Sequence, residues 1–195
     1  AFEGCNSLSS VYIPESVISI GDSAFSGCSG ITSIFIPEYV TNLGNSIFCD
    51  CSNLINVNIP NGVKRIGKYA FKGCGSLTSI CIPESVTSIE NDSFLGCSDL
   101  NRIQVEEDNP VYRSEGNCLI DIASKVLVRG CQMSVIPNDG SVTSIGDNAF
   151  QGCNGLISIT LPDGMKLIGS SAFRGCSSLI SITLPDGMKL IGSSA

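Results

Sequence analysis

Cysteine is the residue type in this chain with the widest capacity for chemistry, because its thiol forms disulfides, binds metals and acts as a nucleophile. Seven of the eleven cysteines recur at one position of a repeated pattern, spaced by 23 residues with a single wider interval of 56. These seven are Cys5, Cys28, Cys51, Cys74, Cys97, Cys153 and Cys176. If successive repeats stack at the strand spacing of about 4.7–4.9 Å, the seven side chains form a ladder.

The redox state of this ladder has two interpretations. Free cysteine is among the most buried residue types, so the ladder fits a row of small buried thiols. Disulfides between adjacent rungs are the alternative, because bridged cysteines have Cα atoms about 4.4–6.8 Å apart. We expect free thiols, and the odd total leaves at least one thiol unpaired in a monomer.

Metal binding and catalysis are not expected. The other cysteines lack the spacing of metal ligands, and the chain has no histidine to complete a zinc site. They are Cys49, Cys81, Cys118 and Cys131. Without histidine, the usual general base and the Ser/His and Cys/His pairs are missing. The glycines mark the ends of repeats instead of forming a phosphate-binding loop. We therefore expect no enzyme, no catalytic residue, no metal and no cofactor.

The charge balance argues against two classes of partner. A net charge of −7 and a pI near 4.4 disfavour nucleic acid, which requires many cations to neutralise phosphates. They also disfavour docking on anionic lipid through a basic patch. A local basic cluster, Lys64, Arg65, Lys68 and Lys72, is interpreted as the solvated edge of one repeat. No stretch approaches the roughly 18 apolar residues that span a bilayer, so we expect no direct membrane insertion within this segment.

Phenylalanines supply the framework that positions the cysteines. One phenylalanine lies three residues before each cysteine of the ladder; the series is Phe2, Phe25, Phe48, Phe71, Phe94, Phe150 and Phe173. A constant period between 20 and 50 residues marks a stacked repeat architecture. With 43% hydrophobic residues, each repeat has inward-facing side chains that only its neighbours can bury.

One coil of the repeat illustrates the expected elements. Residues 31–37 alternate in polarity like a half-buried strand and end at a proline, which cannot donate to a strand ladder. A short extended segment with Val40 and Leu43 follows, and Gly44 reverses the chain. Residues such as 22–25 are expected to form one helical turn with an aspartate N-cap. We assign the same capping role to the aspartates at turn positions, Asp22, Asp92 and Asp147.

The full pattern is Leu-x-x-Ile-x-Ile-Pro-x-x-Val-x-x-Ile-Gly-x-x-Ala-Phe-x-x-Cys, as in residues 77–97, where Glu90 replaces the usual glycine and Ser93 the usual alanine. It closely resembles the BspA-type leucine-rich repeats of microbial surface proteins, over essentially the whole chain. The resemblance implies an α/β-type, right-handed, curved leucine-rich repeat solenoid. It also implies a parallel β-sheet on the concave face, short extended segments elsewhere, and a cell-surface or extracellular location.

The chain is expected to be a single array over residues 1–195, with about eight coils. Regular 23-residue coils are expected at 1–100 and 146–195, and longer variant coils at 101–145 with a β-hairpin at 117–128. Both ends fall inside the repeat, so we expect a fragment of a longer protein. The interruption is interpreted as a variant coil, with a protruding element that contacts a partner as the alternative.

The outward positions of the expected strands are the surface that is free to vary. Five coils depart there from the serine and threonine of the last two, and the candidate partner-binding residues are Tyr12, Phe35, Asn56, Asn58, Arg102 and Gln104. Aromatic residues and arginine are enriched at binding hot spots. Cross-strand packing on an inactive face is the alternative explanation.

Two functions of different classes follow. The first is a non-catalytic binding or adhesion module of a microbial cell-surface or secreted protein, which binds proteins or other macromolecules of host or neighbouring cells. The second is a structural spacer that displays another domain. Residues 156–172 are identical to residues 179–195, which suggests recent copying and tolerance of length. An intracellular scaffold would fit the reduced cysteines equally well.

Overall fold

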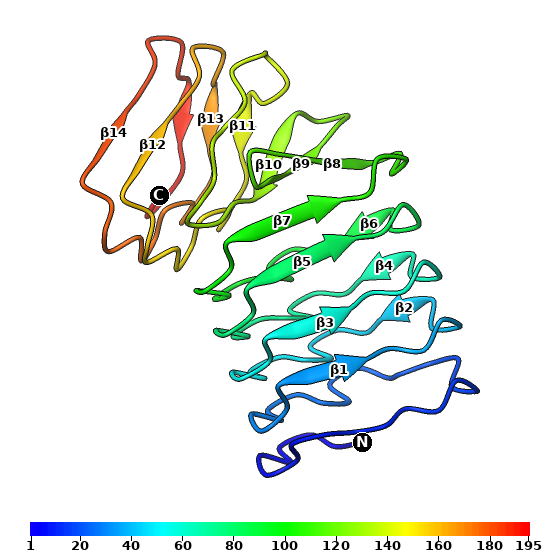
Figure 1. The fold of residues 1–195 in the computed structure, drawn as a ribbon. Coiled ribbons are helices and arrows are strands. Elements are labelled where there is room, and N and C mark those ends of the chain that lie inside the picture. The colour runs from blue at the N-terminus through cyan, green and yellow to red at the C-terminus, as the bar shows by residue number, and fades with distance from the viewer. The chain divides into compact units, whose positions relative to one another are not determined.

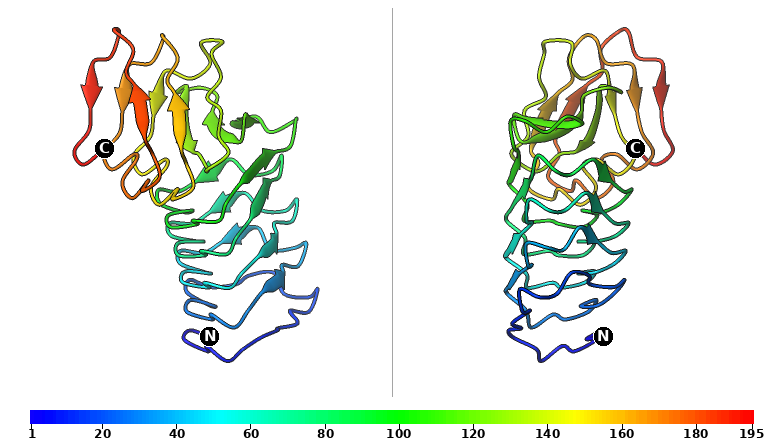
Figure 2. Two further views of the ribbon diagram at one scale, coloured as in Figure 1. Left: turned by 60° about the vertical axis from the view of Figure 1, so that its left-hand side comes forward. Right: turned by 90° about the vertical axis from the view of Figure 1, so that its right-hand side faces the viewer.

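A computed structural model describes all residues, 1–195, and contains strands and turns but no helix. The chain divides into two compact units (Figures 1 and 2). Unit 1 comprises residues 1–100 and 106–110, and unit 2 comprises residues 101–105 and 111–195. Each unit is a stack of coils in which parallel strands of successive coils lie side by side. The predicted fold class, a leucine-rich repeat solenoid, is confirmed.

Each regular coil contributes one front strand and one shorter back strand. In unit 1 the front strands are β1 (Ser33–Phe35), β3 (Asn56–Asn58) and β5 (Ser79–Ile82), and the back strands are β2 (Asn42–Leu43), β4 (Arg65–Ile66) and β6 (Ser88–Ile89). In unit 2 the front strands are β7 (Arg102–Val105), β12 (Ser158–Thr160) and β14 (Ser181–Thr183). Its other strands are β8 (Tyr112–Glu115), β9 (Cys118–Asp121), β10 (Val126–Arg129), β11 (Ser144–Ile145), β13 (Leu167–Ile168) and β15 (Leu190–Ile191).

The period of the sequence sets the register of the strands. In β1 and β3, Ile34 pairs with Val57, its equivalent 23 residues later, and in β12 and β14, Ile159 pairs with Ile182. Because side chains alternate across a strand, the central apolar residue of each front strand points inward and its two neighbours point outward. Repetition of the period therefore carries one inward row and two outward rows along each stack.

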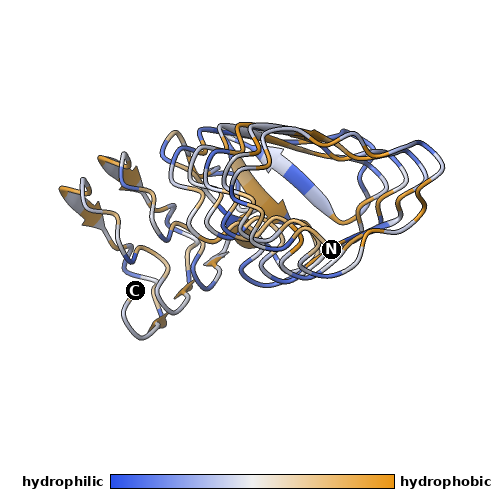
Figure 3. Ribbon diagram, turned by 90° about the horizontal axis from the view of Figure 1, so that it is seen from below, coloured by the Kyte–Doolittle hydropathy of each residue, from blue (hydrophilic) through white to orange (hydrophobic).

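The core of each unit is a stack of identical side chains. In unit 1 the rings of Phe2, Phe25, Phe48, Phe71 and Phe94 follow one another with centroid separations of 5.4–5.8 Å. In unit 2 the rings of Phe150 and Phe173 are 5.1 Å apart. Isoleucine, leucine and valine rows fill the remaining interior. The coils of unit 1 repeat the same path when viewed along the stack (Figure 3).

The expected helical turn is wrong, and its replacement explains how coils are joined. Residues 22–27 form consecutive β-turns, with Ser23 in the left-handed region at φ 53°. Every second amide then points toward the next coil: Ser23 N–H donates to Asn45 O at 2.9 Å and Phe25 N–H to Ile47 O at 3.0 Å. Hydrogen bonds between coils therefore override local helix propensity here.

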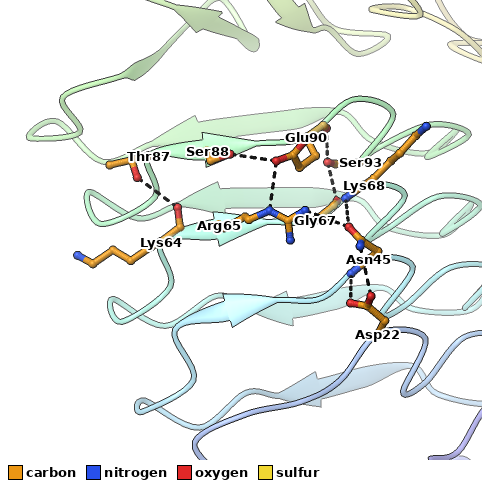
Figure 4. Close-up of polar contacts among 10 residues, drawn as sticks. All are labelled: Asp22, Asn45, Lys64, Arg65, Gly67, Lys68, Thr87, Ser88, Glu90 and Ser93. Atoms are coloured by element: carbon orange, nitrogen blue, oxygen red, sulfur yellow. Dashed lines mark hydrogen bonds and ion pairs between the residues drawn. The ribbon is translucent and has the colours of Figure 1, made fainter.

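The aspartates of these turns also act between coils and not as N-caps. The Asp22 carboxylate accepts a hydrogen bond from Asn45 N–H at 2.7 Å, and Asp147 accepts one from Ser170 N–H at 2.6 Å. Asp92 stands one position later, at the left-handed residue of its turn, with φ 61°. In unit 1 the next coil repeats this contact, because the side-chain oxygen of Asn45 accepts from Lys68 N–H at 3.0 Å (Figure 4).

In unit 2 an antiparallel meander interrupts the regular coils. β8 pairs with β9 and β9 with β10, both antiparallel, while β10 pairs in parallel with β11, the back strand of the next coil. One six-stranded sheet in the order β15-β13-β11-β10-β9-β8 results. The hairpin region thus supplies a back strand to the stack. Strand β8 was not expected from the sequence.

A buried arginine completes this join. Arg129, at the end of β10, is 4% exposed, and its guanidinium donates to Asn148 O at 3.1 Å and to Gln151 O at 3.3 Å. The residue equivalent to Gln151 in a regular coil is Cys49, whose carbonyl accepts from Gly27 N–H of the preceding coil. The arginine side chain therefore replaces a backbone donor that the meander lacks. Its Nε–H has no hydrogen-bond partner.

One position in unit 1 breaks the turn rule and provides a stability prediction. Asp50 has φ 58°, whereas the equivalent residues Gly27, Gly73 and Gly96 have φ between 72° and 75°. A side chain in the left-handed region costs about 1 kcal/mol. We expect Asp50→Gly to raise the free energy of unfolding by about 0.5–1 kcal/mol, measured by urea denaturation.

The matched control for this prediction is Gly27→Ala. A Cβ at Gly27 would have no contact closer than 3.5 Å, so the expected loss of about 1 kcal/mol comes from backbone conformation alone. If Asp50→Gly instead lowered the free energy of unfolding, the contact between Cys49 Sγ and the Asp50 carboxylate, at 3.4 Å, would stabilise the fold by more than the left-handed backbone conformation costs.

Candidate interaction surface

The cysteine ladder is part of the core. The thiols of Cys28, Cys51 and Cys74 donate to phenylalanine carbonyls 26 residues earlier at 2.9–3.1 Å. Cys97 and Cys176 make the same contact at 3.2 and 3.1 Å. No disulfide joins any of the eleven cysteines in this structure. Each of these thiols closes the corner after its turn by satisfying a carbonyl of the preceding coil.

Burial makes these thiols poor nucleophiles. Loss of hydration raises the pKa of Cys51 to about 12 and that of Cys153 to about 11, and neighbouring thiols add to both shifts. The pKa of Cys74 is raised further by the same causes. Because the thiolate is the reactive form, these buried thiols are poor nucleophiles at neutral pH. The buried cysteines of the ladder therefore have a structural role.

The candidate residues of unit 1 lie on the outward side of the front strands. Phe35 is 52% exposed and pairs in register with Asn58, while Ser33 pairs with Asn56. Tyr12 is 83% exposed and occupies the equivalent position one coil earlier, in a segment that forms no strand. Its ring makes no aromatic pair with Phe35. We refer to Tyr12, Phe35, Asn56 and Asn58 as the front face of unit 1.

The candidate residues of unit 2 lie on β7. Arg102 and Gln104 are both exposed, and Arg102 forms no ion pair. Arg102 lines an open depression whose other residues are Asn101, Asn117, Gln132 and Met133. Asn117 comes from the turn between β8 and β9, and Gln132 and Met133 follow β10; none of these three was among the sequence candidates. Their signal in the sequence is weak, because they stand outside the repeat and share no position with other coils.

The regular coils at the end of unit 2 show a different surface. Ser158 pairs with Ser181 and Thr160 with Thr183 in β12 and β14, and all four side chains are exposed. At the outward strand positions, the side chains of these two coils are all hydroxyl-bearing. The aromatic, amide and guanidinium groups of the candidate set lie on other coils.

No group of three or more cysteine, aspartate or glutamate side chains is arranged to hold a metal ion. No helix is long and apolar enough to cross a membrane.

This architecture is similar to that of known leucine-rich repeat proteins. A family model described as the BspA type leucine rich repeat region matches in six copies over residues 1–115 and 121–195. A leucine rich cell surface protein from Faecalibacterium prausnitzii is similar at 32% identity and a TM-score of 0.84, over 96% of this chain and 50% of that one. A leucine-rich repeat protein from Eubacterium ventriosum is similar at 25% identity and a TM-score of 0.73, over 89% of this chain and 53% of that one.

The pneumococcal vaccine antigen PcpA shares the fold, with a TM-score of 0.77 at 22% identity over 87% of this chain and 43% of that one. No curated protein matches the chain. The chain thus spans about half the length of the Faecalibacterium and Eubacterium proteins.

Proposed function

Because the chain belongs to the BspA-type leucine-rich repeat family, we propose that it is a non-catalytic protein-binding and adhesion module of a microbial cell-surface or secreted protein. It engages macromolecules of host or neighbouring cells through the outward positions of its front strands. The description of the Faecalibacterium relative as a cell surface protein supports this location. No side chain in the chain offers a general base of the usual histidine type, which supports the non-catalytic assignment.

The observation that carries the proposal is the exposure of Tyr12 and Phe35. They are 83% and 52% exposed, and both stand on coil positions where the core does not require an aromatic ring. Large rings exposed to water gain free energy when a partner covers them. Asn56 and Asn58 beside them supply amide donors and acceptors for a partner backbone. Arg102 and Gln104 offer a comparable combination in unit 2.

Alanine substitution tests the proposal. Beads coated with the chain are expected to adhere to host epithelial cells, and Tyr12→Ala, Phe35→Ala and Arg102→Ala are each expected to lower the affinity about tenfold, the effect of removing a hot-spot residue. Tyr39→Ala is the matched control, since Tyr39 is 69% exposed but lies outside the front strands. Equal loss with the control would reject the front strands as the binding site.

A spacer function is favoured by one specific observation. Residues 156–172 and 179–195 are identical in sequence and pair in register. Two identical coils present the same side chains twice, so they add length without a new combination of groups. A spacer would leave adhesion insensitive to the front-face substitutions.

A further inference from the structure

A basic cluster lies on the opposite side of unit 1 from the front strands. Four of the eleven cations of this acidic chain fall within residues 64–72. Arg65 is occupied, because its Nε–H donates to Glu90 at 3.2 Å and its Nη2 donates to Asn45 at 3.1 Å. Lys64, Lys68 and Lys72 form no ion pair. Three ammonium groups are therefore available for a ligand.

Tyr69 holds two of these ammonium groups together. The Nζ atoms of Lys68 and Lys72 lie 4.7 and 5.2 Å from the centre of the Tyr69 ring. Cation–π attraction at this range restricts both flexible side chains, which lowers the entropy lost when a ligand binds them. The sequence suggested only a solvated edge for this cluster. The ring contacts define a preorganised pair of cations.

The backbone of Tyr69 is unusual for an aromatic residue. Its φ is 59°, in the left-handed region. The equivalent residues of other coils are small or short and polar: Ser23, Ser46, Asp92, Asn148, Ser171 and Ser194. A bulky side chain is disfavoured in this region, and strained residues of this kind cluster at functional sites. The stability of the turn therefore does not explain the aromatic ring at this position, which points to a function for Tyr69.

We propose that Lys64, Lys68, Tyr69 and Lys72 form a binding site for a linear anionic polysaccharide. The lysine ammonium groups contact its sulfate or carboxylate groups, and Tyr69 keeps Lys68 and Lys72 in place. Lys64 and Lys68 extend in opposite directions from the two ends of β4 (Figure 4), so a ligand that contacts both must be extended. Asn91, which is exposed, occupies the Lys68 position in the following coil and supplies an amide suited to sugar hydroxyls.

The same observations disfavour other polyanions. Specific duplex DNA binding commonly uses about 6–10 phosphate contacts, more than three free lysines provide. An anionic membrane meets a broad protein surface, and the net charge of −7 would repel it outside this cluster. A flexible acidic peptide has no array of hydroxyl groups to match the Asn91 amide. The polysaccharide is therefore the partner that best fits three free lysines beside an exposed amide.

The experiment uses a heparin decasaccharide as the probe and surface plasmon resonance of the whole chain at about 50 and 200 mM salt. Binding is expected at the lower salt, with log K falling against log salt at a slope of about −2 to −3 for three cations. K68A/K72A is expected to weaken binding at least tenfold. K166A/K189A is the matched control and is expected to bind like wild type, because it removes two exposed lysines of unit 2.

Substitutions at Tyr69 separate preorganisation from charge alone. Y69S installs the residue found at this position in other coils, so folding is retained, and binding is expected to fall about fivefold. Y69F keeps the ring and is expected to bind like wild type. Failure of the wild-type chain to bind heparin, or equal losses in K68A/K72A and K166A/K189A, would overturn the proposal. Equally tight binding of polyglutamate or duplex DNA would overturn the assignment to an anionic polysaccharide.

Discussion

Phe71→Ala is expected to lower the free energy of unfolding of unit 1 by about 4 kcal/mol, the upper part of the range for large-to-small substitutions in a core. Phe71 is fully buried, and its ring stacks on Phe48 and on Phe94, each at 5.5 Å. Its carbonyl accepts the thiol of Cys97 at 3.2 Å. Removal of the ring breaks the phenylalanine row in the middle, where the neighbours on both sides lose their contact.

Phe2→Ala is the matched control, because Phe2 occupies the same position of its coil. It is 42% exposed and stacks on one ring only, Phe25 at 5.4 Å. In a solenoid each coil contacts only its neighbours, so we expect a loss of about 1–2 kcal/mol. Urea unfolding followed by far-UV circular dichroism measures both variants. Similar losses for the two substitutions would show that the stacked ring row does not hold the coils together.

Alkaline pH is expected to destabilise the fold strongly, through the buried thiols. Burial raises the pKa of Cys51 and Cys118 from 9.0 to about 12 and that of Cys153 to about 11. A thiol with a raised folded-state pKa keeps its proton in the folded chain after the unfolded chain has lost it. Its contribution to stability is therefore complete below pH 9 and is lost as the pH rises through about 11–12.

The size of this effect follows from the shifts. Each such thiol removes about 1.4 kcal/mol of stability per pH unit above its unfolded pKa, so three thiols at two units above it remove much of the 5–15 kcal/mol typical of a domain. Unfolding free energies from urea titrations between about pH 8 and pH 11 measure the loss. The Cys51→Ala variant lacks one of these thiols, so its free energy of unfolding is expected to decline less steeply with pH, by the contribution of that thiol. Thiolate absorbance from all eleven cysteines in the folded chain near pH 9 would contradict burial as the cause.

Periodicity predicted the interior of this protein well. Each phenylalanine and cysteine of the 23-residue series is placed by the same local pattern, and stacking requires identical positions to coincide, so one coil explains the others. The inward rows of the front strands follow by alternation. Ile34 and Ile159 are accordingly buried, and their outward neighbours Phe35 and Thr160 are exposed.

The turns and the interruption were predicted less well, for physical reasons. Residues 22–25 have the local signals of a capped helical turn, but the amides of Ser23 and Phe25 donate to the next coil. Nothing local in the sequence reveals that use. The role of Arg129 is likewise not visible in the local sequence, because its partners Asn148 and Gln151 come from a coil about 20 residues away. The left-handed ring of Tyr69 likewise became visible only in the folded backbone.

The candidate site was predictable only as the set of residues that the repeat pattern does not explain. The repeat accounts for inward residues, and what remains exposed includes Tyr12, Phe35 and Arg102. The depression beside Arg102 depends on Asn117 and Gln132, which the meander brings to β7 through pairings outside the repeat. Sequence periodicity contains no information on such contacts.

The most direct measurement compares two variants in one adhesion assay. The first is Tyr12→Ala/Phe35→Ala. The second lacks residues 173–195, so the chain ends at Ala172 with a last coil segment identical to the original one. If the front strands bind a partner, the double substitution abolishes adhesion to epithelial cells and the shortened chain adheres like wild type. Full adhesion by the double variant, with a loss on shortening, would contradict a binding module and identify a spacer.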